Sequence, residues 1–431
     1  MTTKFLLRGG CVLTMGRTNF AEADVLIDED RIVEIGPGLR DRDAEVVDAT
    51  DTIVMPGFVD SHRHVSESLF RNHGDSPSSP GYGQHYEPED AYAGTLIGLL
   101  GAIEAGITTV VDWFDLGHGL GCLEAALQAH ADSGIRSVLV VAVPAAGEGW
   151  QADLKSVIGK GTSMLTMAAG APTPTTGSLD EVAADWALAR ELGLRIHTHV
   201  GIDPGADQGV VGELAAGGLF GGDVTLVQCT HLGDADFDAI ASSGVAVSLT
   251  PSSGMSGGEA RPPMQELIDR GIRPGLGVGS ELSSPGDMFA QMRAVISVQH
   301  ATLFDLKLAG KAGIPTLLNT REVLRYATVE GARAAGVGEV VGSLAPGRQA
   351  DLIMLRTDRP NIFPINDPIG AVVWGMDTSN VDWVFVAGRP MKRAGVLQSD
   401  VARATDLANA AQHRVAAAAG LLVGVDSEAT R

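Results

Sequence analysis

The sequence predicts an α/β fold: a (β/α)8 TIM barrel with a small β-sandwich domain formed by both chain ends. Eight short apolar runs recur at fairly even intervals, and most are followed by an amphipathic or Ala-rich stretch. Short β-branched runs lie at both ends of the chain, outside this alternating part. A length of 431 residues suits a barrel with an accessory domain.

The two chain ends have the texture of short strands separated by turns. Val25–Asp28 and Arg31–Ile35 are β-branched runs near the start, and Asp351–Leu355 and Val381–Gly388 resemble them near the end. We predict that residues 1–55 and 345–400 pair into one composite β domain.

Between these ends, residues 56–344 are expected to form the barrel. A helix is predicted over Leu179–Leu192, and the Gly- and Pro-rich segment Gly74–Pro88 reads as an active-site loop. Residues 401–431 form a C-terminal tail, helical over Ala402–Ala419, that could cover a subunit face in a homo-oligomer, either a dimer or a tetramer. The eight predicted strands begin near Ile53, Thr108, Arg136, Leu165, Leu194, Val224, Val245 and Arg273.

Composition narrows the range of partners. A formal charge of −22 leaves no basic surface for a phosphate backbone, so nucleic acid is not expected. No stretch approaches the roughly 20 apolar residues that span a bilayer. The 3 cysteines are widely spaced, which fits a reducing cytoplasm. A small molecule is the expected partner.

Histidines stand at the ends of several predicted strands. His62 and His64 close the strand that begins at Pro56; being two apart, they share a face that would point inward at the barrel mouth. A lone pair of this kind is more often a feature of the core, but His199 and His231 follow later strands in the same way. Imidazole ligands with so few cysteines favour one divalent ion: zinc, with iron or manganese as alternatives.

With these motifs the sequence resembles the amidohydrolase superfamily, in the branch of metal-dependent chlorohydrolases and cytosine- and adenosine-type deaminases. The resemblance runs nearly end to end. Its motifs are Pro56–His64, Tyr86–Asp90, Ala105–Thr109, His197–His199, Thr230–Leu232, Ala327–Ala332 and Gly342–Leu352.

The resemblance implies one metal ion on His62, His64 and His199, with His231 polarising the substrate. It also implies hydrolysis of a carbon–nitrogen bond, in a small cyclic amidine or aminated heterocycle, by metal-activated water. Glu67 and Trp113, together with His231, are the expected substrate-binding residues.

Two acidic residues of the family pattern are missing. Ile202 stands where a proton-shuttling glutamate is expected, and Gly279 where a metal-binding aspartate is expected. Glu281, two residues beyond Gly279, should point to the same side and is our candidate base, although it could equally be a solvated rim residue. Asp203 is a weaker substitute for the glutamate.

Three hypotheses follow from this departure. The first is hydrolysis of a carbon–nitrogen bond. The second keeps the fold and the metal for a non-hydrolytic cyclisation, dehydration or lyase step in specialised metabolism. The third is a catalytically silent relative, against which the retained histidines speak.

Overall fold

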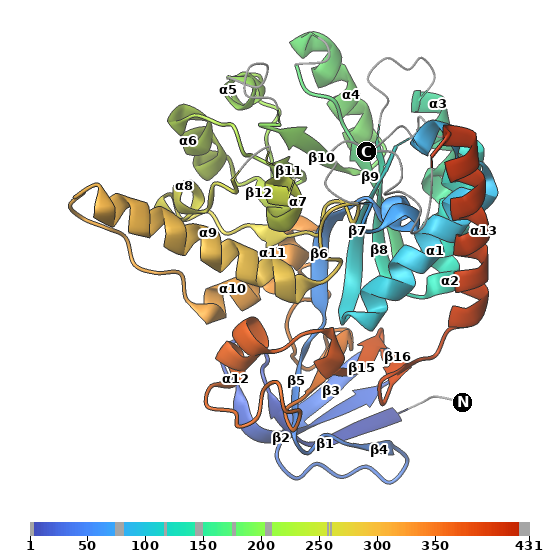
Figure 1. The fold of residues 1–431 in the computed structure, drawn as a ribbon, viewed down its shortest axis with the longest axis vertical. Coiled ribbons are helices and arrows are strands. Elements are labelled where there is room, and N and C mark those ends of the chain that lie inside the picture. Colours follow the sequence, from blue (N-terminus) through green and yellow to red (C-terminus); the bar gives the residue numbers. More distant parts are fainter. Residues whose placement is uncertain are drawn as a thin grey trace.

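The computed structural model describes residues 4–73, 82–115, 119–142, 150–174, 178–202, 209–256, 258 and 261–421. These residues contain an eight-stranded parallel sheet, curled into a barrel, and a separate nine-stranded sheet of mixed direction below it (Figure 1). The predicted fold class is confirmed.

The barrel closes between its first and last strands through backbone hydrogen bonds. Gly279 N donates to His62 O at 2.9 Å, and His64 N donates to Gly279 O at 2.9 Å. Seven strands begin within two residues of their predicted starts. In spatial order the strands are β6 (Phe58–Arg63), β7 (Ile107–Asp115), β8 (Arg136–Ala142), β9 (Leu165–Gly170), β10 (Arg195–Val200), β11 (Val224–Gln228), β12 (Ala246–Leu249) and β13 (Gly275–Leu276).

The predicted start of the first barrel strand at Ile53 is wrong. The apolar run divides at Gly57: β5 (Thr52–Pro56) pairs with β14 in the mixed sheet, and only β6 enters the barrel. A Cβ atom on Gly57 would lie 2.1 Å from the Thr108 side chain. Only glycine therefore allows the chain to pass from one sheet to the other here, and burial on both sides hides the break from a hydrophobicity pattern.

Strands from both chain ends make up the mixed sheet. Its order is β17-β16-β15-β14-β5-β1-β2-β3, with β4 beside β1. It has its own core, which includes Phe5, Leu7 and Phe385, and the buried Arg136–Asp351 ion pair at 2.8 Å ties it to the barrel. The remaining bounds are β1 (Lys4–Val12), β2 (Phe20–Asp28), β3 (Arg31–Gly36), β4 (Glu45–Asp48), β14 (Leu352–Arg356), β15 (Val381–Val386), β16 (Arg389–Arg393) and β17 (Val396–Leu397).

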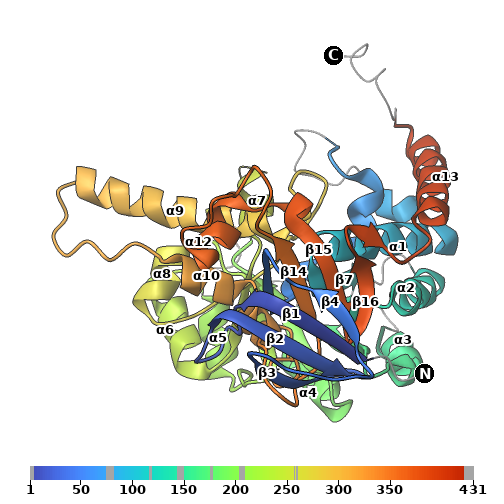
Figure 2. The same cartoon turned by 90° about the horizontal axis from the view of Figure 1, so that it is seen from below.

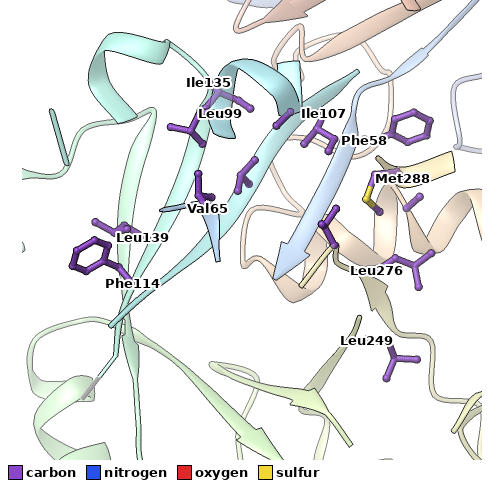
Figure 3. Close-up of a cluster of buried hydrophobic side chains, with 14 of the residues drawn as sticks. Phe58, Val65, Leu99, Ile107, Phe114, Ile135, Leu139, Leu249, Leu276 and Met288 are labelled. Atoms are coloured by element: carbon purple, nitrogen blue, oxygen red, sulfur yellow. The ribbon is translucent and has the colours of Figure 1, made fainter. Parts of the chain in front are cut away.

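Helices surround the barrel and bury its outer face. Figure 3 shows the resulting core, where Leu99, Ile107 and Leu139 lie among other apolar side chains. The predicted helix is confirmed as α4, and Ser178 and Glu181 form its capping box. The helices are α1 (Pro88–Glu104), α2 (Leu120–Ser133), α3 (Trp150–Val157), α4 (Leu179–Glu191), α5 (Val210–Ala216), α6 (Asp234–Ser243), α7 (Pro251–Ser256), α8 (Met264–Asp269), α9 (Met288–Leu308), α10 (Thr320–Tyr326), α11 (Val329–Ala334) and α12 (Pro368–Gly370). Shorter helical turns are η1 (Val65–Phe70), η2 (Tyr82–His85), η4 (Ile158–Lys160), η5 (Ala371–Gly375) and η6 (Thr378–Asn380).

The C-terminal helix α13 (Val401–Ala419) packs on its own chain. It lies along α1 and also contacts η1 and η2 (Figures 1 and 2). Arg414 pairs with Asp90, and Gln412 Nε2 donates to Leu69 O at 3.1 Å. One face of the helix is therefore buried within the chain, and the contact of the tail with another subunit stays a prediction. Across the described ranges, no helix combines the length and apolar character needed to cross a bilayer.

Candidate metal centre at the barrel mouth

Three histidines converge at the carboxyl end of the barrel strands. His62 lies on β6, His64 follows it directly, and His199 lies near the end of β10. One ring nitrogen from each lies within 4.8 Å of the others. The two parallel strands thus bring residues that are 137 positions apart in the chain into one cluster.

The separation of these nitrogens fits a shared ion. His62 Nε2 and His199 Nε2 are 3.2 Å apart. Two nitrogens at 2.0–2.1 Å from a tetrahedral zinc ion would be about 3.3 Å apart. The site contains no carboxylate among the three ligands, so its donor set is neutral.

Burial favours the unprotonated form of two of these rings, His62 and His199. Desolvation lowers the pKa of His62 well below its usual value, and the neighbouring His199 adds to the effect. Desolvation, followed by the charge of His64, lowers the pKa of His199 to about 3. A ring must be unprotonated to bind a metal ion, so the surroundings favour the ligating form.

The Trp113 ring borders the histidine cluster. The Trp113 ring on β7 packs edge-on against His199, with ring centroids 4.3 Å apart, and its centroid lies 5.7 Å from that of His62. His197 is buried two residues before His199, and neither of its ring nitrogens has a hydrogen-bond partner among the described residues. The same holds for His62 Nδ1, which lacks the carboxylate or carbonyl partner common behind a ligating histidine.

His231 is held beside the end of β10. Its backbone N donates to Gly201 O at 3.0 Å, and its side chain is half-buried. Gln228 and Cys229 just before it have φ angles of +73° and +56°, a left-handed pair that ends β11 and redirects the chain across the mouth. Sequence reasoning missed this turn, because neither residue is a glycine.

A small pocket lies at the ends of three barrel strands. Its walls come from the ends of β10, β11 and β12 and from the segment after them, and none of its described lining residues is charged. The lining residues are Ile202, Gln228, Thr230, Leu249, Thr250, Gly254 and Pro262. Ile202, in the place of the family glutamate, thus makes part of this pocket apolar. Asp203, our weaker candidate, lies outside the described residues, as does part of the predicted loop Gly74–Pro88.

Glu281 does not face the histidines as we expected. Its carboxylate is buried and pairs with Arg63 at 2.7 Å and with Arg71 at 2.9 Å, and it also accepts a hydrogen bond from Ser68. These partners outweigh desolvation and lower its pKa to about 2. A carboxylate held this way is a poor proton acceptor near neutral pH, so the prediction of Glu281 as the base must be corrected.

Arg63 is the centre of a buried ionic network that the sequence did not reveal. It sits between the two histidines of β6, fully buried, and also approaches Asp60 at 3.4 Å. Asp60 Oδ1 accepts from Val278 N at 3.0 Å and so links the first and last strands. Desolvation dominates at Asp60 and raises its pKa to about 6. Glu281, at 2.7 Å, is the nearer counterion of Arg63. The sequence signal that could have indicated this network is the arginine between two inward-facing histidines, since alternation places its side chain on the opposite, buried side of the strand.

The space of the missing aspartate is closed. Gly279 has a φ of +73°, and a Cβ atom there would lie 2.9 Å from Ser253 Cβ and 3.0 Å from Thr250 Cβ. Ser253 also accepts a hydrogen bond from Ser280 N at 3.4 Å. Helix α7 therefore fills the place that a longer side chain at Gly279 would need.

Glu67, another predicted substrate-binding residue, lies on η1 and accepts a hydrogen bond from Ser280 Oγ.

A second network that the sequence did not reveal fixes the start of η1. Asp112 accepts from Val65 N at 3.0 Å and from His130 at 2.9 Å, and His130 in turn contacts Ser137 at 2.8 Å. All three side chains are buried. They orient the segment that follows His64.

A parallel barrel with histidines at its carboxyl face defines the class of metal-dependent TIM-barrel hydrolases. Residues 53–391 match the sequence profile of the amidohydrolase family, and the chain belongs to this family. The predicted family and enzyme class are confirmed.

Relatives of known activity align over most of the chain. A 5'-deoxyadenosine deaminase of Methanothermobacter thermautotrophicus is 30% identical over 421 residues, which cover 91% of this chain and 94% of the relative. A 5-methylthioadenosine/S-adenosylhomocysteine deaminase of Desulfitobacterium hafniense is 30% identical over 416 residues, covering 90% and 93%.

Solved structures share the fold. An adenosine deaminase from Xanthomonas campestris with bound zinc superposes with a TM-score of 0.83 at 21% identity and covers 96% of this chain and 99% of its own. An atrazine chlorohydrolase variant from Arthrobacter aurescens, complexed with zinc and atraton, gives a TM-score of 0.83 at 22% identity and covers 95% and 100%.

Proposed function

We propose that the protein removes an amino group hydrolytically from an aminated heterocycle, using one zinc ion held by His62, His64 and His199. The observation that carries this proposal is the convergence of three imidazoles at the barrel mouth, with two ring nitrogens 3.2 Å apart. When bound there, a divalent ion supplies Lewis acidity and lowers the pKa of water.

The chain's own residues have separate parts in this proposal. Trp113 presents a ring face beside the histidines against which a flat heterocycle can stack. His231 is the group that holds the leaving nitrogen and returns a proton to it, because Ile202 and Gly279 leave no carboxylate at the two family positions. Glu281 and Arg63 position the ends of β6 and β13 through their ion pair.

Purine nucleosides altered at the 5' position are the substrate class that we propose first. The relatives that align over about nine-tenths of the chain are named for deamination of 5'-deoxyadenosine and 5-methylthioadenosine. Triazines are the second class, from the likeness to atrazine chlorohydrolase. The described lining of the pocket at the ends of β10, β11 and β12 is uncharged, which agrees with a neutral substrate.

Two measurements on the same preparation test the proposal. Elemental analysis should find about one zinc per chain, and incubation with 5'-deoxyadenosine or 5-methylthioadenosine should release ammonia and shift the ultraviolet spectrum from adenine to hypoxanthine. His199→Ala should lose both signals, whereas His413→Ala, in the exposed part of α13, should keep both. Protein that binds zinc but releases no ammonia from any aminated purine or triazine would contradict the deaminase assignment.

A second candidate function uses the same fold and metal without hydrolysis. It is supported by Gly279. The water-activating aspartate is missing at this position, and Ser253 and Thr250 fill the space that its side chain would need. A cyclisation, dehydration or lyase step needs no such base. Mass spectrometry of products formed in ¹⁸O-labelled water separates the two candidates, since only hydrolysis incorporates the label.

We also propose a cytoplasmic location. The three cysteines are free in the structure, and Cys122 and Cys229 are buried. Unpaired thiols of this kind are typical of a reducing compartment.

A further inference from the structure

A cavity of about 570 Å³ lies at the opposite end of the barrel from the histidines. Its walls come from α2, from the residues at which β8 and β9 begin, and from the turn that joins β15 to β16. Helix α2 and strand β16 lie side by side in both views of the fold (Figures 1 and 2). The cavity is therefore between the barrel and the mixed sheet, and its size is typical of a small-molecule site.

The buried part of the lining is almost entirely apolar. Its one polar member is His130, and both ring nitrogens of His130 are already bonded within the protein. An apolar lining covers the apolar body of a ligand and so supplies most of the free energy of binding. The buried apolar residues of the lining are Leu127, Ile135, Leu165 and Val386.

The exposed edge of the cavity is rich in hydrogen-bond donors. Lys160 pairs with Glu124, which is the one acid among the described lining residues. Arg389 forms no ion pair with a described residue. The Oγ1 atom of Thr162 accepts from two backbone N–H groups, so its hydroxyl can still donate to a ligand. The lining thus has two cations against one acid, although the whole chain has a net charge of −22.

The turn that carries Arg389 is fixed without a ligand. Ala387 and Gly388 have left-handed φ angles of +46° and +71°, and they join β15 to β16 as a two-residue hairpin loop. Ala387 N donates to Asp351 Oδ1 at 2.8 Å, and Gly388 N donates to Ala350 O at 3.0 Å. Because the backbone of Arg389 is held beside the cavity in advance, a ligand has less to order when it binds.

We propose that this cavity binds a small anion with an apolar body, of the class of aromatic or medium-chain carboxylates and sulfonates. The apolar lining covers the body of the ligand, and Arg389 and the Thr162 hydroxyl donate hydrogen bonds to the anionic group. A local excess of cations on an acidic chain selects such a ligand by position rather than by overall attraction. The site does not take part in the proposed reaction, which uses the other end of the barrel, so either can fail without the other.

The test uses 8-anilinonaphthalene-1-sulfonate, an aromatic anion whose fluorescence rises in an apolar site. Titration of the full-length protein should show about one site per chain, with a dissociation constant on the order of 10 μM. The neutral N-phenyl-1-naphthylamine has the same rings without the sulfonate, and it should bind about 10-fold more weakly because it forms no charge-assisted hydrogen bond. Equal affinity for the two dyes would contradict an anion site.

Two variants test the location of the dye. Arg389→Ala should weaken binding of the anionic dye by about 10-fold, whereas Arg359→Ala, at an exposed arginine outside the lining, should not. Ala131 lies on the exposed side of α2 and lines the cavity, so Ala131→Trp should fill it and weaken binding by about 100-fold. The matched control is Ala418→Trp, at an exposed position of α13.

His199→Ala separates this site from the metal centre. It should bind the dye as the wild type does, because His199 lies near the carboxyl end of β10. Circular dichroism establishes that each variant is folded. A wild type that binds no dye would overturn the proposal, as would unchanged binding in Ala131→Trp. Loss of binding in His199→Ala would place the dye at the metal centre and overturn it as well.

Discussion

The two sides of the barrel mouth differ in the functional side chains that they carry. On one side, β6 and β10 carry His62, His64 and His199 in the pattern of the family, and their nitrogens converge as a metal site requires. On the other side, Gly279 lies in the segment that follows β13, and the nearest acid, Glu281, is turned to Arg63. The comparison teaches that holding a metal and supplying a base are separable tasks within one fold.

The difference extends to packing. On the histidine side, His62 Nδ1 and both ring nitrogens of His197 are buried without a hydrogen-bond partner among the described residues, and the Trp113 ring packs beside them. On the β13 side the polar groups are already paired within the protein. Glu281 bonds to Arg63, Arg71 and Ser68, and Ser253 fills the space next to Gly279. Four predictions test this division, in descending order of expected effect.

The first prediction tests the histidine side. His199→Ala should lower zinc affinity by about 1,000-fold or more, because it removes one of three ligands and the remaining two hold the ion weakly. Competition with a chromophoric chelator measures the affinity. His413→Ala is the control and should bind as the wild type does. Unchanged affinity in His199→Ala would mean that the ion binds elsewhere.

The second prediction tests the closed space at Gly279. Gly279→Asp should destabilise the fold by about 4 kcal/mol, from a left-handed backbone plus overpacking against Ser253 and Thr250. Gly193→Asp is the control: its φ is +72° but nothing lies within 4 Å of its Cβ position, so it should cost only about 1 kcal/mol. Urea unfolding measures both.

A compensating change sharpens the second prediction. Gly279→Asp/Ser253→Gly should recover part of the lost stability, since it removes the closest atoms. If Gly279→Asp alone is as stable as the wild type, the place of the aspartate is not closed and the comparison fails.

The third prediction concerns the ion pair of Glu281. Its carboxyl pKa falls from 4.5 to about 2 on folding, so the ionised form stabilises the native state above about pH 4.5, and this contribution is lost as the pH falls toward 2. Glu281→Gln should therefore cost about 3 kcal/mol at pH 7.

The third prediction is tested by measuring the free energy of unfolding of Glu281→Gln and of the wild type over a range of pH. The difference should shrink steadily between about pH 4.5 and 2. Glu213→Gln, at an exposed position on α5, should show no such dependence. A pH-independent cost for Glu281→Gln would show that packing, not charge, is what the side chain supplies.

The fourth prediction has the smallest effect on stability. Ile202 is 47% exposed, so Ile202→Glu should change the free energy of unfolding by less than about 0.5 kcal/mol. If hydrolysis is limited by a missing acid, ammonia release should rise by up to about 100-fold. Val33→Glu, at an equally exposed position on β3, should change neither quantity. A fall in activity with Ile202→Glu would instead mean that the substrate needs this apolar wall.

Much of the fold could be read from the sequence because hydrophobic period and chain direction are local properties. Seven barrel strands lie within two residues of their expected starts, and the two ends pair as predicted. The exception at Ile53 arose because a fully buried strand and its neighbour across Gly57 give one continuous apolar run.

The candidate ligands were also accessible from the sequence, since alternation along a strand decides which residues share a face. His62, His64 and His199 needed only that rule and the parallel direction of the strands. The same alternation rule predicted that Glu281 points to the side of Gly279. However, β13 ends at Leu276, so the alternation does not extend to Glu281. Its side chain follows the turn instead and meets Arg63.

The sequence by itself determined the barrel, the two-ended sheet and the set of histidines, because these depend on periodicity and on motif spacing. Only the tertiary structure decided the partners of Glu281, the closure at Gly279 by Ser253, and the cavity between α2 and the turn that joins β15 to β16. Each of these depends on contacts between residues far apart in the chain, where burial and charge pairing are set by packing that no local pattern encodes.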